Sequence, residues 1–159
     1  MSRLDSFIRR LTAQRDILNA IVELVDGREG PVLEFGLGNG RTYDHLREQF
    51  PDRRIIAFDR EVRSYSSSTP PAENMVTGDI RQSGQDFLGI GAALAHADIG
   101  TGHDDIDAIT LTWLPQLMEG VLAPGGIAVS GLPLERDALE PLPLPPGIKE
   151  GRYFIYRRR

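Results

Sequence analysis

The first part of the chain has apolar residues at three- and four-residue spacing, with polar or charged residues between them. One face is therefore apolar, and this spacing predicts an amphipathic helix over residues 4–25. Ser2 and Asp5 match a capping box at its start, and Gly27 matches a C-terminal stop. We expect this N-terminal segment, 1–27, to cover one face of a sheet.

The hydrophobic period then changes to short apolar runs, each of which predicts a buried strand. The first run, 32–35, leads into a glycine-rich loop over 36–40 and then into helical spacing over 41–50. The second run, 54–58, ends at Asp59. Strand, loop, helix and strand in this order form a βαβ unit, which requires a parallel sheet.

The rest of the chain alternates between further apolar runs and loops. The apolar runs predict strands over 75–79, 94–99, 127–130 and 152–157, the last of them antiparallel to the others. The loops are polar or proline-rich and cover 64–74 and 132–147. The fold class expected is α/β, with a single doubly wound, mostly parallel sheet, an antiparallel C-terminal strand and an N-terminal helix.

Two more helices are predicted between these strands. Helical spacing is weak over 83–93, which contains several glycines, and clear over 104–122. Pro115 should kink or break the second of these helices, because proline cannot donate a backbone hydrogen bond. Trp113 and Leu117 are expected to lie in the core.

Composition narrows the class of protein. A chain of 159 residues, 40% hydrophobic and 26% charged, suits one soluble globular domain, 1–159, with a core over 30–131 and a C-terminal loop and strand over 132–159. The lack of cysteine excludes disulfides, thiolate metal sites and a cysteine nucleophile. A net charge of −5 argues against a nucleic-acid partner. With no membrane-length apolar run and no signal-peptide pattern, we expect a cytoplasmic protein without a membrane partner.

The glycine loop carries the most chemical information. Gly36, Gly38 and Gly40 permit a sharp turn from strand to helix and let a ligand approach bare backbone. A dinucleotide fold requires the pattern G-x-G-x-x-G, but the third glycine here comes one residue early, and Arg41 stands in its place. A nicotinamide-dependent oxidoreductase is therefore a weaker alternative.

The segment Glu34-Phe-Gly-Leu-Gly-Asn-Gly40 resembles motif I of the class I S-adenosylmethionine-dependent methyltransferases. Three further matches follow in the same order: Asp59 at a strand end, Asp79 after the third strand, and Leu122-Ala-Pro-Gly-Gly126 before an apolar strand. The resemblance covers about 30–131. It implies a Rossmann-like methyltransferase fold, in a small bacterial branch of the superfamily.

The resemblance also implies the cofactor, S-adenosylmethionine, and a set of residues that contact it. Asp59 would bind the ribose hydroxyls, as acids do in dinucleotide folds; Asp79 would contact the adenine, and Glu34 would orient the amino-acid end. The full set expected to bind the cofactor is Glu34, Gly36, Leu37, Gly38, Asn39, Gly40, Tyr43, Asp59, Arg60, Gly78, Asp79, Ile80 and Asp98.

Methyl transfer is an in-line displacement that depends mainly on positioning, so no conspicuous catalytic residue is required. His103 lies in a glycine-rich loop after the fourth strand and is the candidate general base. His96 falls within an apolar strand and is expected to be structural. No metal is expected, because Ser130 and Gly131 stand where a magnesium-dependent catechol-type site would need an Asp-Asn pair.

The function expected is methyl transfer to a small-molecule acceptor, since little chain lies beyond the core. A shortened second crossover, between Asp59 and Met75, leaves one pocket wall reduced and favours a homo-oligomer. A non-catalytic S-adenosylmethionine-binding protein that has lost its acceptor site is the main alternative.

Overall fold

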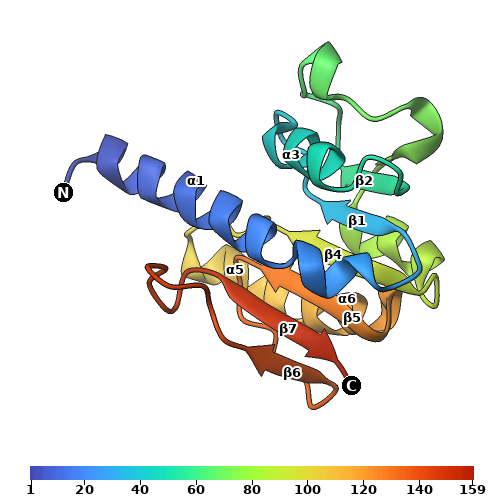
Figure 1. The fold of residues 1–159 in the computed structure, drawn as a ribbon. Helices are drawn as coiled ribbons and strands as arrows, with labels where there is room; N and C mark the ends of the chain where they lie inside the picture. The colour runs from blue at the N-terminus through green and yellow to red at the C-terminus, as the bar shows by residue number, and fades with distance from the viewer.

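The computed structural model describes residues 1–159, which form one seven-stranded sheet (Figure 1). The strand order is β3-β2-β1-β4-β5-β7-β6. The strands are β1 (Val32–Phe35), β2 (Ile55–Asp59), β3 (Met75–Thr77), β4 (Ala92–Ala97), β5 (Leu122–Ser130), β6 (Leu139–Leu142) and β7 (Phe154–Arg158). Strands β1 to β5 are parallel, and β7 is antiparallel to both of its neighbours. This confirms the predicted α/β fold and its antiparallel C-terminal strand.

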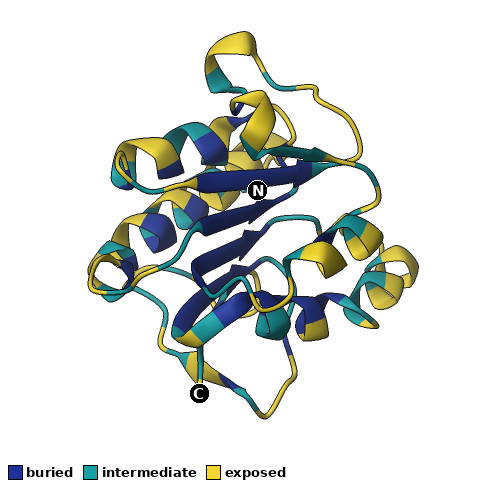
Figure 2. Ribbon diagram, turned by 90° about the vertical axis from the view of Figure 1, so that its right-hand side faces the viewer, coloured by how far each residue is buried: buried dark blue, intermediate teal, exposed yellow.

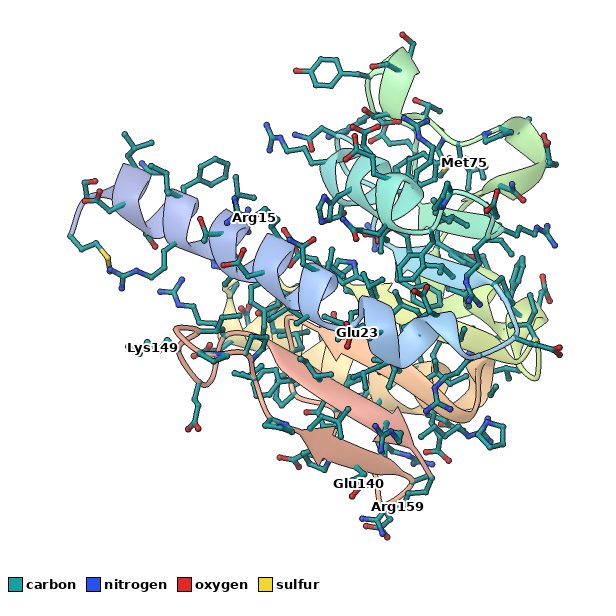
Figure 3. All side chains as sticks on the ribbon, in the orientation of Figure 1. Arg15, Glu23, Met75, Glu140, Lys149 and Arg159 are labelled. Atoms are coloured by element: carbon teal, nitrogen blue, oxygen red, sulfur yellow. The ribbon has the colours of Figure 1, made fainter.

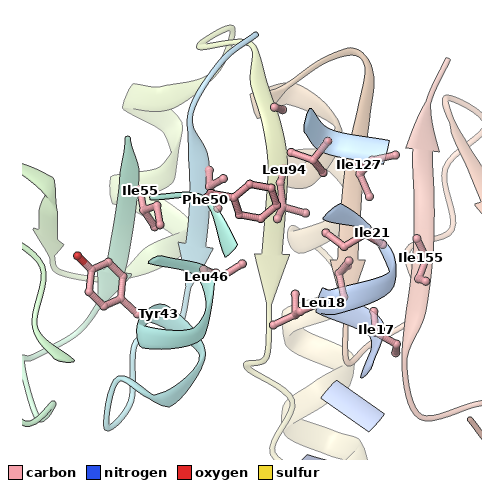
Figure 4. Close-up of a cluster of buried hydrophobic side chains, with 14 of the residues drawn as sticks. Ile17, Leu18, Ile21, Tyr43, Leu46, Phe50, Ile55, Leu94, Ile127 and Ile155 are labelled. Atoms are coloured by element: carbon pink, nitrogen blue, oxygen red, sulfur yellow. The ribbon is translucent and has the colours of Figure 1, made fainter. Parts of the chain in front are cut away.

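Helices cover both faces of the sheet, so that the strands are buried and the outer helix faces exposed (Figure 2). On one face, α1 (Arg3–Ala20), α2 (Val22–Asp26) and α3 (Arg41–Gln49) pack on the strands through one apolar cluster (Figure 4). On the other face, a second cluster includes residues of α6 (Leu114–Val121). Both faces of a parallel sheet are normally covered in this way, because its strands are apolar on both sides.

The predicted N-terminal helix is divided into two. Helix α1 ends at Ala20, and Ile21 caps it before α2 begins. The capping box at its start is confirmed, since the Asp5 amide donates to Ser2 Oγ at 3.0 Å and the Ser2 amide donates to Asp5 Oδ2 at 3.0 Å. Only the second half of α1 packs on the sheet, with Ile17 and Leu18 buried, so the first half covers nothing.

The prediction of a helix over 83–93 is wrong. The segment contains the end of α4 (Ile80–Ser83) and the 3-10 turn η3 (Gly84–Phe87), and β4 already begins at Ala92. The first two residues of β4, Ala92 and Ala93, are fully buried in the sheet. The loop over 64–74 is confirmed, with only two single-turn 3-10 helices, η1 (Ser66–Ser68) and η2 (Ala72–Asn74).

The helix predicted over 104–122 is broken, as Pro115 indicated. Helix α5 (Asp104–Leu111) ends before Thr112, and α6 begins at Leu114 with the proline in its first turn. A proline is tolerated there because first-turn amides have no partner within the helix. Trp113 lies at the break and is only partly buried, whereas Leu117 is buried as expected.

The C-terminal region differs in one element. The segment 132–147 contains no helix, but it includes β6, which the sequence analysis missed. Strand β6 pairs only with β7 at the edge of the sheet and contains Pro141. Proline argues against a central strand but is tolerated at an edge, where its missing amide would face solvent.

Candidate active site

A cleft opens at the carboxyl ends of the parallel strands, where the strand order reverses between β1 and β4. In open α/β sheets, this switch point is where ligands bind. The cleft has a volume of about 430 Å³, within the range of small-ligand pockets. Its lining residues are Gly36, Gly38, Asp59, Arg60, Asp79, Ile80, Asp98, Ile99, Thr101, Ile106, Thr110 and Trp113.

Seven of these lining residues belong to the set that the sequence predicts to bind the cofactor. They come from four separate segments, and strand order alone brings them together. Two hollows elsewhere are larger, at about 520 and 970 Å³, but they lie at the amino-end edge near Pro31 and beside β6. Neither contains a predicted site residue, so the cleft at the switch point is the candidate site.

The glycine loop is held against the end of β2. The amides of Gly36 and Leu37 both donate to the Phe58 carbonyl, at 2.8 and 3.2 Å. Gly38 has a φ of +54°, and a Cβ there would meet no atom within 4 Å, so its backbone faces open space. At Gly40 a Cβ would lie 2.4 Å from the Ser68 carbonyl oxygen. Glycine is therefore required at position 40 by packing, and it leaves room for a ligand at position 38.

Asp59 joins two of the segments that line the cleft. Its Oδ2 accepts from the Gly38 amide at 2.8 Å, and its Oδ1 accepts from the Arg60 amide at 2.7 Å. Each carboxylate oxygen can accept more than one hydrogen bond, so both can also receive a hydroxyl group. The Asp59 carbonyl accepts from the Gly78 amide at 2.9 Å, which ties β2 to the turn after β3.

Asp79 caps helix α4, because its Oδ1 accepts from the Arg81 amide at 3.0 Å. The carboxylate also lines the cleft, next to the apolar side chain of Ile80. The structural and the ligand-binding interpretations of Asp79 are thus compatible. An acid beside an apolar side chain suits an aromatic ring that carries an amino group.

Asp98 follows β4 and lies between the cleft and α1. Its Oδ2 accepts from Gln14 Nε2 at 2.8 Å, and Gln14 is only 5% exposed. The sequence analysis missed Gln14, since an amide within an amphipathic helix gives no signal of a partner 84 residues away. This bond links the N-terminal helix to the carboxyl end of β4.

Glu34 and His96 form a fully buried pair behind the glycine loop. The Nδ1 atom of His96 lies 2.9 Å from Glu34 Oε2, and Thr42 Oγ1 donates to Glu34 Oε1 at 2.9 Å. His96 is therefore a buried, hydrogen-bonded residue, as expected from its place in an apolar strand. Glu34 does not line the cleft, so it can affect a ligand only indirectly, through the residues that it bonds, Thr42 and His96.

Several predicted cofactor-binding residues lie outside the cleft lining. Leu37, Gly40 and Tyr43 are buried, and Tyr43 packs in the first apolar cluster (Figure 4). Asn39 is exposed on the glycine loop, and Gly78 precedes Asp79 without lining the cleft.

The candidate base, His103, is exposed and immediately precedes α5. It does not line the cleft, although Thr101, two residues earlier, does. The loop is ordered by Asp107, whose carboxylate accepts from the amides of Thr101 at 2.8 Å and Gly102 at 3.1 Å. These bonds hold the pKa of Asp107 below its usual value, with the Thr101 amide as the largest cause.

The chain lacks two further features. No group of three or more His, Cys, Asp or Glu side chains is placed to hold a metal ion. None of the helices has the length and apolar character needed to span a bilayer.

The residues of the cleft fit S-adenosylmethionine in their chemistry. Asp59 offers acceptors for a ribose diol, and Asp79 with Ile80 suits an adenine. Asp98 adds a further carboxylate to the lining, which suits a positively charged amino-acid end. Gly38 leaves the backbone open to contact.

Comparison with known structures gives close and distant matches. A crystal structure of an S-adenosyl-L-methionine methyl transferase from Silicibacter pomeroyi DSS-3 is 43% identical, with a TM-score of 0.91, over 100% of this chain and 99% of that chain. A TDP-rhamnose 3′-O-methyltransferase of calicheamicin biosynthesis is 18% identical, with a TM-score of 0.63, over 98% of this chain and 81% of that chain. A 16S rRNA (adenine(1408)-N(1))-methyltransferase from Catenulisporales acidiphilia is 10% identical, with a TM-score of 0.54, over 89% and 93%. The last two matches show the fold alone.

No curated protein matches the chain. The family described as S-adenosyl-L-methionine methyltransferase matches residues 1–158, which is nearly the whole chain. This agrees with the glycine loop and acids of the cleft and disfavours the nicotinamide-dependent alternative. The chain belongs to the S-adenosyl-L-methionine methyltransferase family, and it is an S-adenosylmethionine-dependent methyltransferase.

Proposed function

We propose that S-adenosylmethionine binds along the cleft at the carboxyl ends of β1 to β4. Asp59 accepts hydrogen bonds from the ribose hydroxyls of the cofactor, Asp79 and Ile80 contact its adenine, and Asp98 faces its amino-acid end. The observation that carries this proposal is the convergence of Gly38 and these acids on one cleft at the switch point of the sheet.

The members of the predicted set that do not line the cleft act indirectly in this proposal. Glu34 orients the amino-acid end through the loop that it supports, because its carboxylate is held by His96 and Thr42. Leu37, Asn39, Gly40, Tyr43 and Gly78 keep the glycine loop and the adenine turn in shape, and Arg60 lies at the rim beside Asp59.

When bound, the cofactor supplies an electrophilic methyl group. The chain's own contribution is to hold the two reactants in line and to exclude water. Thr101 and Trp113 lie on the side of the cleft toward α5. We propose His103, in the adjoining loop, as the group that takes the acceptor's proton. The test is the rate of methyl transfer, which should fall in His103→Ala and stay unchanged in His45→Ala. His45 is the matched control because it bonds Asn19 on α1, away from the lining of the cleft.

We propose a small molecule as the acceptor. The cleft carries three carboxylates, from Asp59, Asp79 and Asp98, against one cation, Arg60. A phosphate backbone is disfavoured by such a surface. Methyl transfer to a panel of small hydroxyl, amine and carboxyl compounds, run beside ribosomal RNA, tests this choice; transfer to RNA alone would contradict it.

The first experiment is a calorimetric titration of the purified protein with S-adenosylmethionine, S-adenosylhomocysteine and NAD in parallel. Binding of the first two without NAD is expected, and binding of NAD alone would overturn the proposed site.

We also propose that the chain forms a homo-oligomer and acts in the cytoplasm. The mass of the protein in solution tests the first of these proposals, and cell fractionation tests the second.

A further inference from the structure

The first half of α1 extends past the carboxyl-end edge of the sheet (Figure 1). Gln14 bonds Asp98 at this edge, and the residues before Gln14 continue outward as a helix from Arg3. Eleven residues of helix span about 16 Å. In Figure 3 the helix before Arg15 runs out beyond the sheet, and every residue of 3–10 except Ser6 is exposed. We call residues 3–10 the overhang.

The overhang carries an apolar row that the body of the protein leaves exposed; within it, the Arg10 guanidinium lies 5.6 Å from the centroid of the Phe7 ring. Leu4 and Leu18 lie fourteen residues apart in α1, so they share one face of this helix. Leu18 is 1% exposed, whereas Leu4 is 65% exposed. Phe7 and Ile8, on the same face as Leu4, are 42% and 53% exposed. Apolar side chains on one helix face that are buried in its second half and exposed in its first half indicate an interaction surface.

The charges of the overhang are positive and unpaired. Arg3, Arg9 and Arg10 flank the apolar row, and none of them forms an ion pair. The single acid, Asp5, is engaged in the capping box with Ser2. The overhang therefore presents an apolar strip bordered by guanidinium groups.

Helix α5 presents the complementary surface. It has no buried residue, and Ile106 and Ile109 are 46% and 62% exposed. Asp104 and Asp105 in its first turn form no ion pair, and α5 contains no basic residue. An apolar patch bordered by carboxylates matches the overhang in both apolar character and charge.

We propose that the occupant of both surfaces is a second copy of this chain, with the overhang of each subunit packed across α5 of its partner. A two-fold dimer allows this exchange, because each subunit then gives and receives the same contact. Ile106 and Thr110 of α5 also line the cleft, so the partner's overhang closes the side of the cleft toward α5. This last consequence rests on the proposed cofactor site, whereas the interface itself does not.

The first test is the mass of the protein in solution without cofactor, by light scattering after size exclusion. We expect twice the chain mass of 17.6 kDa for the wild type and a monomer for the double variant Leu4→Ser/Ile8→Ser. Leu88→Ser is the matched control, since Leu88 is 47% exposed on a different part of the surface, and should remain a dimer. A monomeric wild type, or a dimer unchanged in the double variant, overturns the proposal.

The second test uses charge reversal, which does not depend on apolar truncation. Arg9→Glu/Arg10→Glu should raise the dimer dissociation constant at least tenfold, and so should Asp104→Lys/Asp105→Lys. The combination of all four changes should restore most of the wild-type affinity, because opposite charges again face one another. Additive weakening in the fourfold variant contradicts the pairing of these helices.

The effect on the cleft is measured last. Cofactor affinity of the wild type should fall on dilution through the dimer dissociation constant. In the Leu4→Ser/Ile8→Ser variant it should stay at the value of the diluted wild type at every concentration. A dimer that forms as expected but binds no cofactor would refute the proposed cofactor site and leave the interface intact. An unchanged affinity in a monomeric variant would refute the closure of the cleft by the partner.

Discussion

Glu34 on β1 and His96 on β4 lie opposite each other in register, with both side chains fully buried and His96 Nδ1 2.9 Å from Glu34 Oε2. Burial opposes the charged imidazole, but the charge and hydrogen bond of Glu34, with a smaller contribution from Asp98, outweigh it and raise the pKa of His96. Because Thr42 on α3 also bonds Glu34, the pair fixes the strand and the helix on either side of the glycine loop.

Breaking this pair should be costly. His96→Gln or Glu34→Gln leaves the other buried group without a partner of opposite charge, and each change should lower the free energy of unfolding by about 3–5 kcal/mol. Glu34→Leu/His96→Leu removes both groups and should cost less than the sum of the single changes. Denaturant unfolding of the variants measures this coupling. Strictly additive costs would show that the two side chains do not interact.

The pair should also give stability a pH dependence. The pKa of His96 is raised in the folded protein, so the folded state binds more protons than the unfolded state above about pH 6.5. The stabilisation is therefore complete below about pH 6.5 and is lost as the pH rises through the folded pKa. We expect the difference in unfolding free energy between wild type and His96→Gln to shrink as the pH rises from about 6.5 through the folded pKa of His96. A difference that grows with pH would indicate a neutral His96.

The parallel core of the fold could be predicted because each of its signals is local. Apolar runs of strand length, the glycine loop and acids at strand ends all lie within a few residues of one another. Asp59 and Asp79 were identifiable in this way, since the end of a parallel strand determines the edge on which a residue lies. Even Pro115 indicated the break between α5 and α6.

The features that the sequence did not reveal depend on contacts between distant segments. Gln14 contacts a cleft residue, Asp98, only because α1 crosses the end of β4. Trp113 has the apolar spacing of a core residue, but the helix break turns it toward the cleft. Strand β6 depends on pairing with β7, and its proline masks the strand pattern. Periodicity reports one buried face, and it does not report which other segment covers that face.

The glycines at positions 38 and 40 should respond differently to substitution. Gly38→Ala adds a methyl group where no atom lies within 4 Å. It should therefore lower the free energy of unfolding by only about 1–2 kcal/mol, the cost of a left-handed backbone conformation for alanine. Its methyl group points into the proposed cofactor space and should weaken S-adenosylmethionine binding. Gly40→Ala forces a Cβ against Ser68 and should cost about 2–4 kcal/mol. Thermal unfolding and calorimetry separate the two effects; equal stability losses would contradict this account.

Asp59 should contribute to affinity through its charge. Asp59→Asn keeps the size of the side chain but removes charge-assisted hydrogen bonds, so binding of S-adenosylmethionine should weaken by about tenfold to hundredfold. Asp52→Asn is the matched control, because Asp52 precedes the same strand at the opposite edge of the sheet. An affinity that is unchanged in Asp59→Asn, or equally reduced in Asp52→Asn, would remove the assigned role.

The bond between Gln14 and Asp98 gives a test of how the cofactor is oriented. If Asp98 faces the amino-acid end, Gln14→Leu should leave the Asp98 carboxylate free to turn away from the cofactor. Binding of S-adenosylmethionine should then weaken about tenfold, which is the contribution of one hydrogen bond to a charged group. Binding of 5′-methylthioadenosine, which lacks the amino-acid end, should not change. Gln49→Leu is the control, since Gln49 lies near the amino-end edge of the sheet. Equal losses for both ligands would show that Gln14 supports the cleft as a whole, and that Asp98 does not read the amino-acid end.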